Sequence, residues 1–515
     1  MTTAPGRLCT VSEMRKLEAA AMSAGIAEGQ LMENAGAAVF REISTRANGL
    51  SGKSAVVLAG PGHNGGDGLV VARHMARARA LVTIVVSRPR ESDLLVEAAV
   101  QAGARIITFS PGLARRCAAN ADIVVDCLLG IGSSPPLRGQ VERILQEIDG
   151  LTGPFRVACD IASGIDADTG ATDENAFSAD VTVSTGPIKI GSLLHPAQAK
   201  SGRLVETDIG LPGNSLSELG GRILRPEDEA KSLPERTAAG HKGTYGKVLI
   251  AAGCRSYRGA AILACLGAAR TGAGMVSLAS IEPVIAASAA RTSSVTYENL
   301  VEVDGYIAAT NSEPVAKSIE SADAAVVGPG LGRNPGTDEF TRSLIRAAPD
   351  HTPMVVDADA LNACAPAPGA LASCRSGLVV TPHPGEMGRL LGTSAIQVQR
   401  NRLASALEGA KLLGQVVVLK GAGSIVAEPD GAYVVCPWTV PALSHAGSGD
   451  VLAGVIGSLL AQGLKPAPAA RLGVLIHTLA GQKAGERRGP AGAIADDLPE
   501  EIPEVIEELR ALCAG

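Results

Sequence analysis

The sequence predicts an α/β protein built from two doubly wound domains. Its 515 residues exceed what one hydrophobic core usually holds, and they suit two domains of roughly 200 to 290 residues. In both halves, short β-branched segments alternate with helical stretches, which is typical of parallel sheets covered by helices on both faces. Each half also contains a glycine-rich turn that carries an aspartate, at residues 60–68 and 446–450.

The first half begins with two expected helices. Residues 10–13 match a capping box, which predicts a helix with Met14, Leu17 and Ala21 on one face. A second amphipathic helix is expected over about residues 31–43. The expected strands of this half are the β-branched runs 55–58, 82–86, 105–109, 122–127, 155–160 and 180–184.

A segment dense in Gly, Pro and Ser, residues 211–226, is the expected linker. We therefore expect one domain over residues 1–222 and a second over residues 226–515. The expected strands of the second domain are 248–252, 275–279, 324–327, 354–357, 378–381 and 416–419. Apolar helices are expected at 260–271 and 451–461.

The composition excludes several function classes. A formal net charge of −6 and only 2% aromatic residues argue against a nucleic-acid-binding surface. The ten cysteines include no C-x-x-C pair, and Cys127, Cys159 and Cys436 lie in apolar runs, as buried, reduced thiols do. No apolar run reaches the length of a membrane span. We therefore expect a cytoplasmic protein with no nucleic-acid or membrane partner.

In the first half, three side chains stand where expected strands end: Asn64, Asp126 and Asp160. Open α/β sheets bind ligands at this edge. The glycine-rich turn beside Asn64 lets a ligand approach the backbone, and the helix after it favours anions. Oxygen ligands from Asn, Asp and Ser suit an alkali or alkaline-earth cation better than zinc. The alternative is that Asp126 and Asp160 merely cap the turns that follow them.

In the second half, Asp450 follows the turn 447–449 and begins an apolar helix. A phosphoryl-transfer enzyme places the group that deprotonates or orients the attacking hydroxyl at such a position. Residues 420–424 leave a strand as a strand-to-strand turn that can lie over a nucleotide. Two converging glycine-rich turns predict a nucleotide site. The alternative for Asp450 is a helix cap.

Four further side chains of the second half have two interpretations each. His383 lies between two prolines on a rigid segment, where it either serves the site or bonds a loop carbonyl. Glu386 either serves the same site or caps the next helix. Asp357 and Asp359 end a strand and either contact magnesium or close a turn.

Residues 10–210 resemble the NAD(P)H-hydrate epimerase family through the motifs G-P-G-H-N-G-G-D-G-L-V-V-A-R, D-C-L-L-G-I-G and D-I-A-S-G-I-D-A-D-T-G. The resemblance implies a Rossmann-like domain that binds K⁺ through Asn64, Asp126 and Ser163. With Asp126 neutralised by the ion, Asp160 is the candidate catalytic proton acceptor at nicotinamide C6. The residues implied to bind the hydrated nucleotide are His63, Asn64, Gly65, Gly66, Asp67, Gly130, Ile131, Gly132, Ser133, Ser134, Pro135, Pro136 and Asp160. His63 and Ala162 stand where the family usually has Asn and Pro.

Residues 226–510 resemble the ADP-dependent NAD(P)H-hydrate dehydratase family of the ribokinase-like fold, through H-K-G-T-Y-G-K-V-L-I-A-A-G, V-G-P-G-L-G, D-A-D-A-L-N, T-P-H-P-G-E, K-G-A-G-S and A-G-S-G-D-V-L-A-G. The residues implied to contact the hydrate are Ala260, Gly330, His383 and Asp450. Those implied to contact the adenine nucleotide are Lys420, Gly421, Ala422, Gly423, Ser424 and Gly449. The stretch 437–445 departs from the Asn-rich family pattern.

Together, the two resemblances imply a bifunctional repair enzyme that epimerises R and S NAD(P)H hydrates and dehydrates the S form while ADP is hydrolysed. Its catalytic residues would be Asp160 and Asp450, with K⁺ in the first domain and Mg²⁺ expected in the second. Its partners would be small molecules, and we expect a homo-oligomer. Two rivals remain: a small-molecule kinase that uses Asp450, and a first domain that only senses nucleotides or acts as a scaffold.

Overall fold

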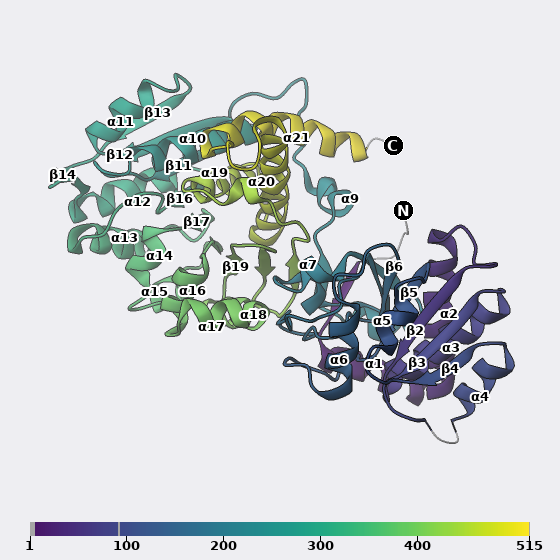
Figure 1. Cartoon of the computed structure of the whole chain (residues 1–515). Helices are drawn as coiled ribbons and strands as arrows, with labels where there is room; N and C mark the ends of the chain where they lie inside the picture. The colour runs from purple at the N-terminus through teal and green to yellow at the C-terminus, as the bar shows by residue number, and fades with distance from the viewer. Residues whose placement is uncertain (1–5, 91–92, 514–515) are drawn as a thin grey trace. The chain divides into compact units, whose positions relative to one another are not determined.

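The computed structural model describes residues 6–90 and 93–513. The chain divides into two compact units, Met1–Arg222 and Ile223–Gly515. Figure 1 shows each unit as helices packed around a sheet. None of the helices in the described residues is long and apolar enough to pass through a membrane.

The first unit contains a seven-stranded, fully parallel sheet with the strand order β4-β3-β2-β5-β6-β7-β9. The strands are β2 (Ser54–Ala59), β3 (Leu81–Val86), β4 (Arg105–Thr108), β5 (Ile123–Cys127), β6 (Phe155–Cys159), β7 (Val181–Thr185) and β9 (Arg203–Thr207). The six strands expected from the sequence are confirmed, and β9 is an addition. The direction of winding reverses between β2 and β5, so a crevice opens where these two strands end.

Helices cover both faces of this sheet. They are α1 (Val11–Ser23), α2 (Glu28–Arg46), α3 (His63–Arg77), α4 (Leu94–Gln101), α5 (Leu113–Ala118) and α6 (Gly139–Ile148). Because side chains alternate along a strand, Val57 packs in the core under α2 and α3, whereas Val56 and Leu58 pack in the core under α5 and α6. The expected capping box is present: Thr10 is the N-cap of α1 and bonds with Glu13.

The expected linker at residues 211–226 is not a plain connection. It contains α8 (Gly213–Ser217) and β10 (Gly221–Ile223). Strand β10 pairs antiparallel with β1 (Arg7–Cys9), which in turn pairs with β8 (Ile188–Lys189). Composition alone missed these strands because their backbone groups find partners that are far away in the sequence.

The second unit has strands in the order β13-β12-β11-β16-β17-β18-β19-β20-β21. These are β11 (Lys247–Ala251), β12 (Met275–Ser280), β13 (Val295–Asn299), β16 (Ala324–Val327), β17 (Met354–Val356), β18 (Leu378–Val380), β19 (Val416–Leu419), β20 (Ile425–Ala427) and β21 (Tyr433–Val435). The strands from β13 to β19 run parallel, and β20 and β21 continue as antiparallel neighbours. The carboxyl ends of the parallel strands therefore meet at one edge.

The main helices of this unit are α10 (Arg258–Thr271), α11 (Glu282–Ala289), α12 (Ser312–Glu320), α13 (Pro335–Ala347), α14 (Asp359–Cys364), α16 (Pro384–Leu391), α17 (Ala395–Arg400), α18 (Arg402–Leu413), α19 (Ser448–Ala461), α20 (Pro466–Arg488) and α21 (Leu498–Cys513). Helices α10 and α19 lie very close together, since a Cβ on Gly454 would approach the main-chain oxygen of Ala264 to 2.0 Å. A residue larger than glycine at this position would therefore push α19 away from α10.

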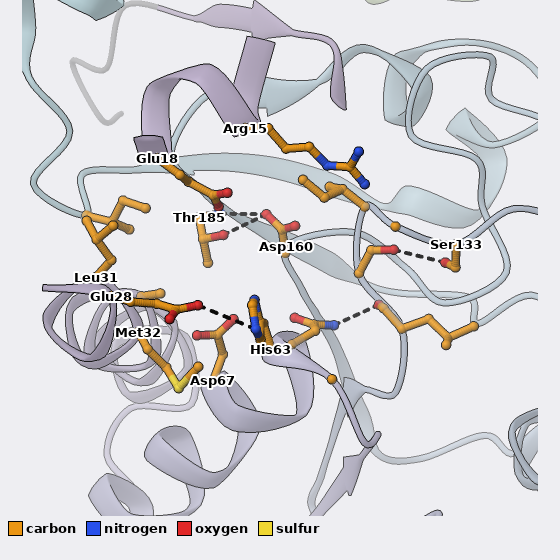
Figure 2. A pocket seen from close by; sticks show the side chains of 18 of the residues that line it. Arg15, Glu18, Glu28, Leu31, Met32, His63, Asp67, Ser133, Asp160 and Thr185 are labelled. Atoms are coloured by element: carbon orange, nitrogen blue, oxygen red, sulfur yellow. Dashed lines mark hydrogen bonds and ion pairs between the residues drawn. The ribbon is translucent and has the colours of Figure 1, made fainter. Parts of the chain in front are cut away.

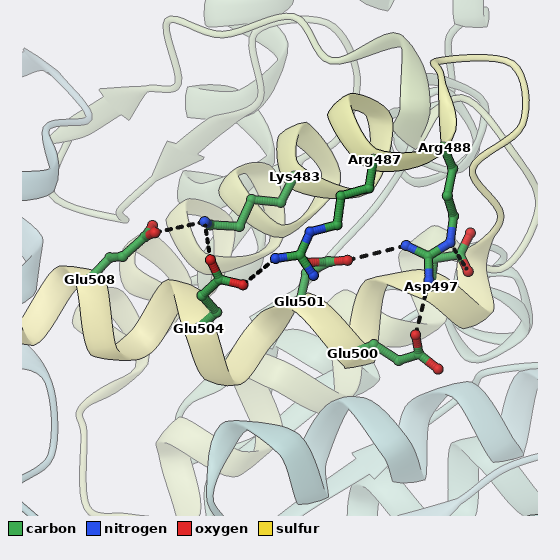
Figure 3. A network of polar contacts seen from close by, with 8 residues as sticks. All are labelled: Lys483, Arg487, Arg488, Asp497, Glu500, Glu501, Glu504 and Glu508. Atoms are coloured by element: carbon green, nitrogen blue, oxygen red, sulfur yellow. Dashed lines mark hydrogen bonds and ion pairs between the residues drawn. The ribbon is translucent and has the colours of Figure 1, made fainter.

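Ion pairs join the last two long helices (Figure 3). On α20, Lys483 lies 2.9 Å from Glu504 and 2.7 Å from Glu508 of α21. Further along, Arg487 pairs with Glu501 at 2.9 Å. The pairs with the exposed Glu504 and Glu508 contribute little singly, whereas Glu501 is buried between the helices.

Candidate active sites

The first unit contains a cavity of about 700 Å³ at the crevice where β2 and β5 end (Figure 2). The predicted site residues that line it are His63, Asn64, Asp67, Gly130, Ile131, Gly132, Ser133 and Asp160. The glycine-rich segment 60–68 is not a turn throughout, because α3 already begins at His63. The first amides of that helix have no helical acceptors, and Gly62, His63 and Asn64 of this start line the cavity.

The other predicted residues of this site lie elsewhere. Gly65 and Gly66 are buried in α3, where a Cβ would lie 2.0 Å from the oxygen of Gly60 and 2.7 Å from Met32, respectively. These two glycines therefore serve close packing. Ser134, Pro135 and Pro136 line a separate hollow of about 380 Å³. His63 is 85% exposed at its side chain and lies 3.4 Å from Glu28.

The structure bonds Ser163 to Asp126, and Asn64 lies near them because Asn64 and Ser163 both bond the main chain of Leu129. Ser163 donates to Asp126 twice, through its amide and its hydroxyl, both at 2.7 Å. Asp126 also accepts the amide of Leu128 at 3.1 Å, so it caps the next turn as well. Burial raises the pKa of Asp126 to about 6.

Asn64 has one satisfied and one unsatisfied polar atom. Its amide nitrogen donates to the oxygen of Leu129 at 2.7 Å, whereas its buried Oδ1 has no partner in the described part of the chain. A buried oxygen without a donor is the signature of a missing cation or water. The cluster of carboxylate, hydroxyl and amide oxygens therefore fits a monovalent cation.

Asp160 ends β6 with a left-handed backbone, φ +69°. Its Oδ1 accepts the Thr185 hydroxyl at 2.7 Å, the Thr185 amide at 3.2 Å and the ammonium of Lys189. Burial alone would lower the pKa of Lys189, but the nearby Asp160 outweighs burial and the pKa is raised. The site therefore contains a buried ion pair. Sequence analysis missed Thr185 and Lys189. The only local sign of either residue is a polar side chain at the end of an apolar strand, Thr185 in β7 and Lys189 in β8.

The second unit contains a cavity of about 400 Å³. The predicted residues that line it are His383, Lys420, Gly421, Ala422, Ser424 and Gly449. Ala260 and Gly330 lie together outside this lining, since a Cβ on Gly330 would come within 2.7 Å of the Ala260 Cβ. Gly423 and Asp450 are also absent from the lining.

Asp450 lies in the first turn of α19 and faces a charged group of side chains. Burial raises its pKa to about 7, and Asp357 adds to this effect while Lys420 opposes it. In the described residues, no donor bonds the Asp450 carboxyl, so the geometry does not support the cap interpretation. Near neutral pH, both the protonated and the ionised forms of this carboxyl group are therefore present, as general acid–base catalysis requires.

Lys420 holds the end of β19 to the end of β17. Its ammonium lies 2.6 Å from Asp357, which also accepts the Thr381 hydroxyl at 2.8 Å. Asp359 instead accepts the amide of Gly332 at 2.9 Å, which ties the loop after β16 to the start of α14 rather than closing a local turn. Among the described residues, no group of three or more His, Cys, Asp or Glu side chains is arranged to hold a metal.

His383 and Glu386 form a capping box at the start of α16, which confirms the cap interpretation of Glu386. Glu386 accepts the His383 amide at 2.8 Å, and its other oxygen lies 3.2 Å from the ring. Burial raises the pKa of Glu386 to about 7 and, with Lys420, lowers that of His383. The ring is therefore neutral near pH 7.

Three other side chains shape the second cavity and were not expected. Arg402 is buried, and its guanidinium donates to the oxygens of Leu419 and Gly423, both at 3.2 Å, which holds the turn 420–424. Trp438, the only tryptophan of the chain, and His477 line the cavity. They escaped sequence reasoning because nothing local marks a pocket-lining aromatic side chain.

Comparison with known proteins identifies both halves. Residues 28–191 match the family profile of the YjeF-related protein N-terminus, and residues 248–504 match that of NAD(P)H-hydrate dehydratase. The bifunctional NAD(P)H-hydrate repair enzyme of Thermofilum pendens is 38% identical and covers 93% of this chain and 92% of its own length. That of Escherichia coli is 33% identical, covering 88% and 85%.

A solved ribokinase-like superfamily protein from Enterococcus faecalis is 20% identical, with a TM-score of 0.50 over 56% of this chain and 96% of its own. This likeness confirms the ribokinase-like fold expected for the second half. The relatives match along nearly the whole chain, through both of its halves. The chain therefore belongs to the family of bifunctional NAD(P)H-hydrate repair enzymes, which combine an NAD(P)H-hydrate epimerase with an NAD(P)H-hydrate dehydratase.

Proposed function

We propose that residues 1–222 interconvert the R and S hydrates of NADH and NADPH in the 700 Å³ cavity, with Asp160 as the proton acceptor. Residues 226–515 then return the S hydrate to the reduced nucleotide, with ADP hydrolysed to AMP and phosphate. The observation that carries this proposal is the presence of two separate cavities, each beside the start of a glycine-rich helix and a buried carboxyl group.

We propose that a potassium ion binds at the buried side of the first cavity, next to Asn64. Asn64, Asp126 and Ser163 would hold it, and the unpartnered Asn64 Oδ1 supports this assignment. The cluster has one carboxylate and two neutral oxygen donors, which suits a monovalent ion better than magnesium. When bound, the ion would offset the negative charge of Asp126 and help fix the phosphate-facing loops.

In the second cavity, we propose that the phosphates of ADP bind at the first amides of α19, near Gly449 and Lys420. Hydroxide leaves poorly, so phosphorylating the C6 hydroxyl before elimination makes the departure easier. Asp450 would remove or orient the hydroxyl proton. Mg²⁺ would accompany the nucleotide and be held largely by its phosphates, because magnesium usually takes only one or two protein carboxylates.

We place the enzyme in the cytoplasm and expect a homo-oligomer. All ten cysteines are free and most are buried, which agrees with a reducing compartment. Light scattering of the purified protein tests the oligomeric state.

The central experiment follows the absorbance of reduced nicotinamide. Mixed epimers of NADH hydrate or NADPH hydrate are supplied with ADP or with ATP. Full recovery with ADP, with AMP and phosphate as products, is expected. A stable phosphorylated nucleotide as the product would instead identify a kinase and overturn the dehydratase proposal.

A further inference from the structure

One carboxyl group in the first cavity has no assigned chemistry. Asp67 lies in the second turn of α3, and its side chain lines the cavity. Within residues 6–90 and 93–513, no group donates to it and no cation pairs with it. A carboxylate in such a setting loses its hydration without compensation, so the neutral acid is the favoured form.

The electrostatics agree with this geometry. Burial raises the pKa of Asp67 well above its ordinary range, and the negative charge of Asp160 raises it further. Lys189 opposes the shift, and Glu18 adds to it. These are the charged groups that act on Asp67 across the cavity, and the balance among them raises its pKa and so favours the protonated form of its carboxyl group.

Asp160 lies in the opposite situation. Lys189 and both donors of Thr185 bond its Oδ1, an arrangement that stabilises a carboxylate. In the described part of the chain, no donor reaches its Oδ2. Figure 2 shows Asp67 and Asp160 reaching into the hollow from different elements, α3 and the end of β6. One cavity thus contains a carboxyl group without a partner and a second carboxyl group bonded by an ammonium and two further donors, the contrast in environment that is typical of an acid–base pair.

Inverting C6 of the hydrate requires both partners. C6 carries a hydroxyl and is bonded to N1, so the nitrogen lone pair can expel the oxygen once that oxygen is protonated. The C–O bond breaks with its electron pair on oxygen, water leaves, and N1 forms a double bond to C6. Water then adds to the other face, the electron pair returns to N1, and one proton of the added water must be removed.

We propose that Asp67 is the catalytic acid of epimerisation and works as a pair with Asp160 across the substrate ring. Asp67 gives its proton to the departing hydroxyl, and Asp160 takes the proton of the water that adds. The opposite epimer reacts by the reverse route, with Asp160 as acid and Asp67 as base. Proton exchange with solvent resets the pair. This inference rests on the proposed epimerase function of the cavity.

The test uses the full-length chain with Asp67→Asn, which keeps the size and neutrality of the protonated side chain. We expect kcat for conversion of the R hydrate to fall by about 100-fold or more, while KM changes only a few-fold. Dehydration of pure S hydrate by the same protein should stay at the wild-type rate and shows that the variant is folded. The matched control is Asp149→Asn, the same change at an exposed position at the end of α6.

Two further readouts separate catalysis from packing. In wild-type protein, the epimerase rate should fall at alkaline pH as Asp67 loses its proton, and Asp67→Asn should lack this limb. In ¹⁸O-labelled water, each catalysed inversion should place solvent oxygen on C6. Full-rate epimerisation by Asp67→Asn, or inversion without label, overturns the inference. A wild-type protein that leaves the R hydrate at its spontaneous rate would instead overturn the epimerase proposal itself.

Discussion

The Nε2 atom of His477 lies 2.9 Å from the main-chain oxygen of Ser448, so α20 is bonded to the first turn of α19. Burial lowers the pKa of His477 to about 4. The ring is therefore neutral at physiological pH, and Nε2 carries the hydrogen that it donates. This bond fixes the glycine-rich helix start where we place the phosphates of ADP.

Replacing His477 with Phe removes the donor and keeps a ring in the cavity wall. One hydrogen bond contributes about 0.5 to 1.5 kcal/mol, so we expect the dehydratase kcat/KM for ADP to fall by about two- to tenfold. His477→Gln, which can still donate, should recover most of the loss. Equal activity of the Phe and wild-type proteins contradicts the role. Epimerase activity serves as the internal control.

Asp450→Asn tests the proposed base of the second site. The change keeps the size of the side chain but removes the group that accepts a proton, so hydrate conversion should fall by about 100-fold or more. ADP binding, measured by calorimetry, should persist because the amides at the start of α19 remain. Near-normal turnover would refute the role of Asp450.

The dehydratase rate should depend on pH in a direction set by Asp450. Its pKa is raised to about 7, so the carboxylate form needed for proton removal is lost as pH falls below that value. The rate with pure S hydrate should therefore rise from pH 6 to pH 8 and then level off. A profile that is flat across this range argues against catalysis by Asp450. The pKa of Glu386 is raised to a similar value, so its contribution to the pH profile is measured separately with the variant Glu386→Gln.

Separating the halves tests the coupling of the two reactions. A fragment covering Ile223–Gly515 follows the boundary between the compact units and is large enough to close its own core. It should consume S hydrate quickly and leave R hydrate to its spontaneous epimerisation. Chiral analysis of the remaining hydrate measures this. If the fragment removes both epimers at the full-length rate, the first half is not the epimerase.

The cation is tested by crystallography and by mutation. Crystals grown with potassium should show a peak beside Asn64 Oδ1, and exchange with rubidium should give an anomalous signal there. Asp126→Ala should lose the peak and slow epimerisation, because a neutral cage of two oxygens binds the ion weakly. The proposal fails if only water occupies the site, or if Asp126→Ala epimerises at an unchanged rate.

Much of the fold could be predicted from the sequence because the information is local. Alternation of β-branched runs and helices predicted the parallel strands β2 to β7, β11, β12 and β16 to β19, usually within one or two residues, but it missed the parallel strands β9 and β13. The capping box at Thr10 and the apolar helix after Asp450 were equally visible, since caps and helical periodicity span only a few residues. The short strands β1, β8 and β10 were not, because their partners are distant in sequence.

For the sites as well, some features could be predicted from the sequence and others only from the tertiary structure. The sequence by itself determined where the glycine-rich helix starts lie and which acids follow the strands, Asp126, Asp160 and Asp450 among them. Only the tertiary structure decided that Lys189 meets Asp160 and that Asp67 stands without a partner. The physical reason is that ionisation depends on burial and on neighbouring charges, and both are produced by packing segments that are far apart in the chain.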